Sequence, residues 1–193
     1  MNNIAILGSG SGSNALKIME YFQKSKVADV VCVISNKASA GVLEHAKNMN
    51  VSSKVFPNDV WQSNPREVID FLDTCGAEVI VLAGFLRKIP TEILKRYPNA
   101  VINIHPSLLP KYGGKGMYGD RVHRAVIENG DSESGITIHL VNEIYDDGEI
   151  LFQAKTNVHT TDKPADVQRK VQQLEHRHFA PAIESFVLNR LNK

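Results

Sequence analysis

The stretch Ile4-Ala5-Ile6-Leu7-Gly8-Ser9-Gly10-Ser11-Gly12-Ser13-Asn14 joins a short apolar run to a helical pattern through a glycine-rich loop. The run 4–7 predicts a buried strand, and residues 14–22 carry apolar side chains at helical spacing. The glycines let backbone amides approach a ligand closely, and the start of a helix adds N–H donors and partial positive charge. We therefore expect an α/β fold whose first turn binds an anion.

Strand and helix patterns keep alternating through the first hundred residues. Further strands are expected at 30–34, 53–56, 79–82 and 100–104, and further helices at 40–48, 66–75 and 93–97. This order predicts a doubly wound, mostly parallel twisted sheet with helices on both faces.

The second half of the chain has a different pattern. Residues 134–141 and 150–158 alternate like two neighbouring antiparallel strands, residues 122–128 indicate a helix, and residues 164–191 form a long amphipathic helix. We expect a mixed or antiparallel C-terminal part, and a single domain over residues 1–193.

The composition excludes several classes of protein. The 193 residues are 42% hydrophobic and 22% charged, with a formal net charge of +1. This balance gives no electrostatic footprint for nucleic acid or an anionic membrane, and no apolar run approaches the ~20 residues of a membrane span. The N-terminal residues lack the basic start and cleavage site of a signal peptide. Cys32 and Cys75 have no metal-like spacing, so we expect reduced thiols and a cytoplasmic protein.

The segment Ile102-Asn103-Ile104-His105-Pro106-Ser107-Leu108-Leu109-Pro110 carries the strongest catalytic signal. Asn103 and His105 are two positions apart, so a strand directs their side chains to the same face. An amide can donate to an oxyanion, and an imidazole can carry a proton near neutral pH, which suits chemistry at a carbonyl carbon. The alternative is a buried strand followed by a proline turn.

The glycine-rich loop favours a phosphate monoester as its ligand. It is not a P-loop, because no Gly-Lys-Ser/Thr follows at the required spacing. It is a poor dinucleotide fingerprint, because Ser13 occupies the third glycine position and Ser35-Asn36 stands where a ribose-binding acid is expected. The alternative is a tight turn in which Ser11 or Ser13 caps the helix.

The acidic turn Asp146-Asp147-Gly148 has two interpretations. It can be a solvated hairpin turn, since Asp and Gly are turn residues. It can also bring one carboxylate to His105, where it would favour the imidazolium, raise the histidine pKa and fix the ring orientation. The residues alone do not choose between Asp146 and Asp147.

Together these motifs resemble the phosphoribosylglycinamide formyltransferases, the folate-dependent glycinamide ribonucleotide transformylase family. The resemblance runs nearly end to end. It includes Gly-Ser-Asn at 12–14, Val-Leu-Ala-Gly-Phe at 81–85, Asn-Ile-His-Pro-Ser-Leu-Leu-Pro at 103–110 and the Asp-x-Gly turn at 146–148. The third motif is specific to folate formyltransferases, and its combination with the Gly-Ser-Asn loop is typical of the glycinamide enzymes.

The resemblance implies a one-carbon transfer in de novo purine (IMP) biosynthesis, from 10-formyltetrahydrofolate to the amine of 5-phosphoribosylglycinamide. It implies that His105 carries the proton, that Asn103 hydrogen-bonds the formyl oxygen as it gains negative charge, and that Asp146 raises the histidine pKa and orders a water. It implies no metal and no covalent enzyme intermediate. The expected partners are these two small molecules, and the expected state is a monomer or weak homodimer.

The resemblance also assigns binding residues to the two halves of the chain. Residues 1–100 would be the Rossmann-like half that binds the ribotide phosphate, and residues 101–193 the catalytic and folate-binding half. The implied ribotide contacts are Gly12, Ser13, Asn14, Gln172 and Glu175, and the implied folate contacts are Arg66, Leu86, Arg87, Lys88, Ile89 and Asn103. Without the resemblance, the two residues of the last helix would be interpreted as an exposed face and Arg87 as a surface charge. His139 is given a structural or supporting role.

The loop 112–120 departs from the family, because it is longer than the usual version and rich in glycine. Glycine predicts mobility in such a loop. It is interpreted either as a lid over folate, with Met117 or Tyr118 packing on it, or as a plain insertion.

Three competing functions are less favoured. Methionyl-tRNA formyltransferase shares the core motif but usually carries a further C-terminal domain that binds tRNA, and formyltetrahydrofolate deformylase usually has an extra N-terminal regulatory domain. Neither extension is expected in this chain. A non-enzymatic phospho-ligand-binding module of flavodoxin-like shape needs only the glycine loop and leaves Asn103 and His105 unexplained.

Overall fold

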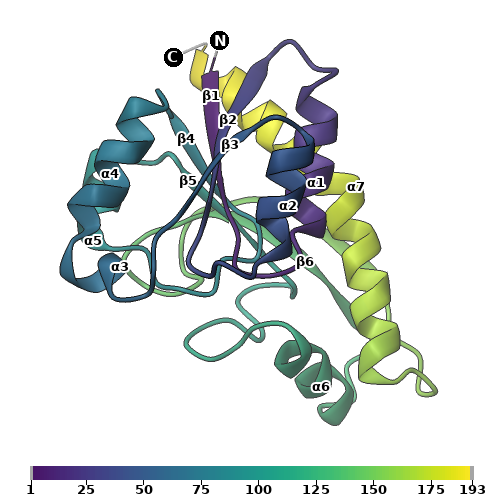
Figure 1. Ribbon diagram of the computed structural model, residues 1–193. Coiled ribbons are helices and arrows are strands. Elements are labelled where there is room, and N and C mark those ends of the chain that lie inside the picture. The colour runs from purple at the N-terminus through teal and green to yellow at the C-terminus, as the bar shows by residue number, and fades with distance from the viewer. Residues whose placement is uncertain (1, 192–193) are drawn as a thin grey trace.

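A computed structural model describes residues 2–191 and shows a sheet of seven strands with helices on both faces (Figure 1). The strands are β1 (Asn2–Leu7), β2 (Ala28–Ser35), β3 (Ser52–Val55), β4 (Val79–Leu82), β5 (Val101–His105), β6 (Glu133–Leu140) and β7 (Ile150–Asn157). The helices are α1 (Ser13–Phe22), α2 (Gly41–Asn48), α3 (Val60–Ser63), α4 (Pro65–Thr74), α5 (Thr91–Arg96), α6 (Asp120–Glu128) and α7 (Pro164–Leu191).

The topology confirms the predicted α/β class. The strands lie in the order β3-β2-β1-β4-β5-β6-β7. Strands β1 to β5 are parallel, whereas β6 runs antiparallel to β5 and β7 antiparallel to β6, as the patterns of the two halves predict. The four-residue helix α3 was not predicted, because so short an element leaves no periodicity to detect.

Alternation along β1 explains why helices cover both faces. Ile4 and Ile6 belong to an apolar cluster with α1, α2, α6 and α7, whereas Ala5 and Leu7 belong to a second cluster with α3, α4 and α5. Successive side chains of a strand point to opposite faces, so a strand buried on both sides is apolar throughout. Figure 1 shows α1, α2 and α7 on one side of the sheet and α3, α4 and α5 on the other.

Parallel strands bring their carboxyl ends to one edge of the sheet, which is where ligands of such folds bind. The glycine loop after β1, the stretch after β4, the end of β5 and the connection between β6 and β7 meet there. Helix α7 packs against α1, α6 and β6, so its polar side chains also reach this edge. No helix within residues 2–191 combines the length and apolarity needed to cross a membrane.

Candidate active site

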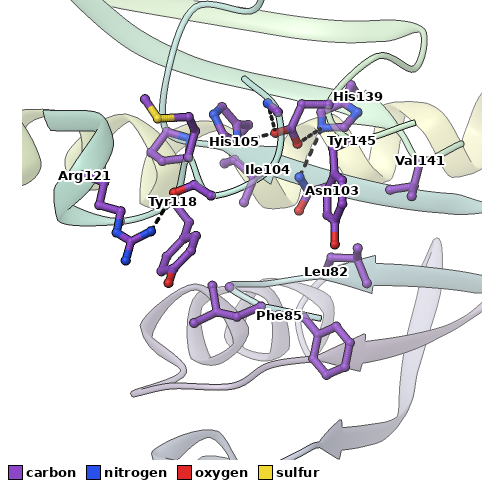
Figure 2. A pocket seen from close by; sticks show the side chains of 18 of the residues that line it. Leu82, Phe85, Asn103, Ile104, His105, Tyr118, Arg121, His139, Val141 and Tyr145 are labelled. Atoms are coloured by element: carbon purple, nitrogen blue, oxygen red, sulfur yellow. Dashed lines mark hydrogen bonds and ion pairs between the residues drawn. The ribbon is translucent and has the colours of Figure 1, made fainter. Parts of the chain in front are cut away.

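A pocket of about 540 Å³ lies at this edge of the sheet (Figure 2). Its volume is within the usual range for small-molecule sites. Its walls come from the ends of β4, β5 and β6, from the loop between β5 and α6, and from one face of α7.

Asn103 and His105 both line this pocket, from the carboxyl-terminal half of β5. Their two-residue spacing puts both side chains on the face that the sequence predicted. Strand β5 extends to His105, one residue further than expected, so the imidazole is held by the sheet rather than by the following turn.

The His105 ring is held from both sides. Its Nε2 lies 2.8 Å from the carbonyl oxygen of Tyr112, and its Nδ1 lies 3.5 Å from Oδ2 of Asp146. A carbonyl oxygen can only accept a hydrogen bond, so Nε2 carries a hydrogen. The proton that His105 gains or loses therefore belongs to Nδ1, the nitrogen that faces the carboxylate.

Opposing effects set the pKa of His105. Burial lowers the pKa of His105 below its usual 6.5, whereas Asp146 and the Tyr112 carbonyl raise it and His139 lowers it further. Asp146 thus raises this pKa as predicted, while burial of the ring is the larger effect and makes the net shift a lowering. The imidazole side chain is only 5% exposed.

The structure distinguishes the two aspartates between which the residues of the turn alone did not choose. Asp146 is 12% exposed at its side chain and points at His105, whereas Asp147 is exposed. Burial raises the pKa of Asp146, but His139, His105 and the backbone N–H of Gly114 outweigh it and hold this pKa below its usual value. The Gly114 N–H donates to Oδ2 over 2.9 Å.

A steric constraint requires glycine at position 148 of the Asp-x-Gly turn. A Cβ on Gly148 would collide with the backbone carbonyl of Leu140 at the end of β6. The turn can therefore fold back over β6 and bring Asp146 to the pocket only because residue 148 lacks a side chain.

The predicted ribotide residues lie together, although the two segments are far apart in the sequence. Gly12 has φ +79° and precedes α1, which begins at Ser13 without a side-chain cap, so the alternative of a serine cap is not realised. Asn14 donates to Glu175 over 2.9 Å, and Gln172 lies 3.4 Å from the Ser13 hydroxyl. Burial raises the pKa of Glu175, and the Asn14 amide partly offsets this.

The predicted folate residues are only partly brought together. Residues 86–89 line the pocket, and the N–H of Leu86 donates to the buried Ser9 hydroxyl, which ties this stretch to the glycine loop. Val141, Ile144 and Tyr145 add apolar surface to the pocket wall. Arg66 is not among the lining residues.

The side chain of Arg66 is 74% exposed and pairs with Asp70 over 2.8 Å, one turn further along α4. The geometry therefore leaves Arg66 outside the pocket, and of the predicted ribotide contacts Gly12 and Ser13 also lie outside its lining, next to Asn14. The resemblance named Arg66 from its position in the sequence alone. The direction of its side chain, and with it the ion pair to Asp70, is known only from the structure.

Several pocket residues were not predicted as functional. They include Arg121, His123 and the backbone of Gly114, whereas His139 was given only a structural or supporting role. The register pairs His139 directly with Asn103 across β5 and β6. Sequence periodicity gives the face of a strand but not its partner residue, so no signal in the chain alone joins these two side chains.

The described residues contain no group of three or more His, Cys, Asp or Glu side chains arranged to hold a metal ion. The Gly114–Gly119 segment lines the pocket, and Met117 and Tyr118 contribute side chains there. Figure 2 shows Tyr118 and Arg121 on the wall opposite Val141 and Tyr145.

Comparison with known proteins agrees with this geometry. Residues 2–183 match the family described as formyl transferase. The phosphoribosylglycinamide formyltransferase of Escherichia coli is 36% identical over 193 residues, which cover 98% of this chain and 89% of that protein. The chloroplastic phosphoribosylglycinamide formyltransferase of Arabidopsis thaliana is 38% identical over 97% of this chain.

The chain spans 66% of the length of the Arabidopsis protein, slightly under two thirds. Among solved structures, glycinamide ribonucleotide transformylase 1 from Symbiobacterium toebii superposes with a TM-score of 0.90 at 31% identity, covering 98% of this chain and 89% of that one. The chain therefore belongs to the formyl transferase family, within the group of phosphoribosylglycinamide formyltransferases.

Proposed function

We propose that this protein transfers the formyl group of 10-formyltetrahydrofolate to the amine of 5-phosphoribosylglycinamide, a step of de novo purine biosynthesis. The observation that carries the proposal is the convergence of Asn103, His105 and Asp146 on one pocket, in a chain whose relatives bear this enzyme's name. Two predicted ribotide residues, Asn14 and Glu175, line the same pocket and are hydrogen-bonded to each other.

Each of the three side chains has a distinct task. The Asn103 amide donates to the formyl oxygen as that oxygen gains negative charge, which is usually a large part of such catalysis. His105 exchanges its proton through Nδ1, because Nε2 is committed to the Tyr112 carbonyl. Asp146 favours the charged imidazole against the effect of burial.

Three of the proposed ribotide residues, Asn14, Gln172 and Glu175, line the pocket, and Gly12 and Ser13 directly precede Asn14 at the start of α1. We assign the phosphate end of the ribotide to Gly12, Ser13 and Asn14, and its other end to Gln172 and Glu175. The apolar slot between residues 86–89 and the turn at 141–145 fits a flat ring system, with backbone groups of 86–89 available to its edge.

Arg66 and Arg87 allow a direct comparison for the folate side. Arg87 lines the pocket, whereas Arg66 must leave Asp70 to reach a ligand. We expect Arg87→Ala to raise the KM for the folate more than Arg66→Ala does, as measured with the ribotide saturating. A larger effect of Arg66→Ala would place the folate tail across α4 instead.

The loop 112–120 is assigned as a cover over the folate, with Tyr118 lining the pocket. A variant lacking residues 115–119 is expected to show a raised KM for the folate. An unchanged KM would make the segment a plain insertion.

The location and assembly of the protein remain predictions within this proposal. Cys32 and Cys75 are both free thiols, which fits a reducing compartment such as the cytoplasm. A monomer or weak homodimer is the expected state, to be measured by sedimentation.

The decisive assay mixes the protein, a 10-formyl folate analogue and phosphoribosylglycinamide, and follows the deformylated folate by absorbance. Turnover that requires the ribotide supports formyl transfer. Turnover without the ribotide identifies a hydrolase, and no turnover with active substrates refutes the proposal. Asn103→Ala is the matched control, since it removes the amide and should lower kcat roughly 100- to 1000-fold with little change in Tm.

A further inference from the structure

We infer that His139 is a positioning residue that orients the carboxamide of Asn103 while its own ring is neutral. The inference rests on the proposed formyl transfer and adds a residue to it. His139 is buried on β6, directly opposite Asn103 on β5. Figure 2 shows the two side chains joined by a hydrogen bond at the pocket wall.

The backbone fixes the tautomer of His139. Its Nδ1 lies 2.8 Å from the carbonyl oxygen of Leu140. The carbonyl oxygen can only accept, so Nδ1 carries a hydrogen, and the neutral ring has no second one. The Nε2 atom of His139 is therefore a hydrogen-bond acceptor.

This acceptor sets the direction of the Asn103 amide. Nδ2 of Asn103 lies 3.1 Å from Nε2 of His139, so the amide nitrogen donates to the ring. Turning the carboxamide over would place its oxygen against the lone pair of Nε2. Nδ2 has two hydrogens, so with one bound to His139 the second remains for the formyl oxygen.

The neutral form of His139 is the one that matches its hydrogen-bond partners, the Leu140 carbonyl and the Asn103 amide. The charged groups that face it are Asp146, with Oδ1 3.7 Å from Nε2, and His105 on the other side of that carboxylate. The 3.7 Å separation is longer than a hydrogen bond, whereas Asp146 accepts from Gly114 and lies closer to His105. A proton on Nε2 would also point at the Asn103 amide hydrogens, so two donors would oppose each other.

Two substitutions separate the two nitrogens of this ring. In His139→Gln the amide oxygen reaches about as far as Nε2 and can still accept from Asn103, whereas in His139→Asn the amide reaches only the place of Nδ1 and keeps the contact with Leu140. We expect His139→Asn to lower kcat roughly 10- to 100-fold, with the KM of both substrates nearly unchanged, because the oxyanion donor is misoriented. His139→Gln should restore most of kcat.

A double-mutant cycle tests whether the effect acts through Asn103. In the Asn103→Ala background there is no amide to orient, so His139→Asn should lower kcat less than about twofold further. The same fold loss in both backgrounds, or a kcat of His139→Asn close to that of the wild type, overturns the inference. These outcomes presuppose an active wild type, so they differ from the failure of formyl transfer itself.

A measurement on the unmodified protein guards against variants that do not fold. Long-range ¹⁵N–¹H NMR spectra at about pH 7.5 should show His139 as the neutral tautomer protonated at Nδ1. A ring protonated at Nε2, or at both nitrogens, would refute the inference without any mutation.

Discussion

Asp146→Asn is the most informative single change, because it removes the charge that opposes the burial of His105 while preserving the shape of the side chain. The separation of 3.5 Å between Nδ1 and Oδ2 allows an estimate. At an effective dielectric constant of about 20, two unit charges at this distance attract by about 5 kcal/mol, so the carboxylate strongly favours the charged imidazole. Both side chains are largely buried, so solvent screening is small.

The sign follows from the contributions to the His105 pKa. Burial already lowers the pKa of His105, and Asp146 raises it. Removing the carboxylate lowers the pKa further, so the limb of the pH–rate profile that reports His105 moves to lower pH. With fewer imidazolium rings near neutral pH, we expect kcat to fall by roughly 100- to 1000-fold, with ground-state binding little changed.

The assay is the pH dependence of kcat and of kcat/KM in the formyl-transfer reaction, with Asp147→Asn as the control. Asp147 is its exposed neighbour in the same turn, so this variant changes the net charge equally but leaves His105 its partner. Its profile should match that of the wild type. An Asp146→Asn profile that keeps its limb, or an equal displacement in Asp147→Asn, would refute the assignment of the carboxylate.

Three further predictions follow from the fold and its titration. Gly12→Ala should raise the KM for the ribotide at least about tenfold but not that for the folate, because the residue has φ +79° and a Cβ would lie 2.6 Å from Cα of Val42. Phe179→Ala, in the α7 core, should lower the free energy of unfolding by about 3–5 kcal/mol in urea titrations, and a loss below about 1 kcal/mol would contradict the packing. The free energy of unfolding should also decrease as the pH falls below about 6.5, because burial lowers the pKa of His105 and His123 and the unfolded chain then binds more protons. His123→Leu should weaken that decrease in urea titrations at several pH values, and an unchanged decrease would show that this ring does not contribute.

Much of the fold could be predicted from the sequence, because the information is local. The buried strand β4 occupies 79–82 and the long helix α7 occupies 164–191, the ranges that the periodicity predicts. The shared face of Asn103 and His105 follows from strand geometry alone.

The remaining features of the site depend on contacts between distant segments. The choice of Asp146 over Asp147 depends on how the turn after β6 folds back. The partner of Asn103 depends on the register between β5 and β6. The net pKa of His105 depends on burial, which reverses the effect expected from its charged neighbour alone.

The two histidines of the pocket show how the backbone assigns different tasks to one residue type. In each ring, the nitrogen away from Asp146 is bound by a main-chain carbonyl, that of Tyr112 for His105 and that of Leu140 for His139. Each ring therefore presents its other nitrogen toward the same carboxylate. Asp146 lies nearer to His105, and Asn103 donates to His139. The first ring is thereby suited to move a proton and the second to hold an amide still, and the main-chain contacts behind this division are not evident from the sequence.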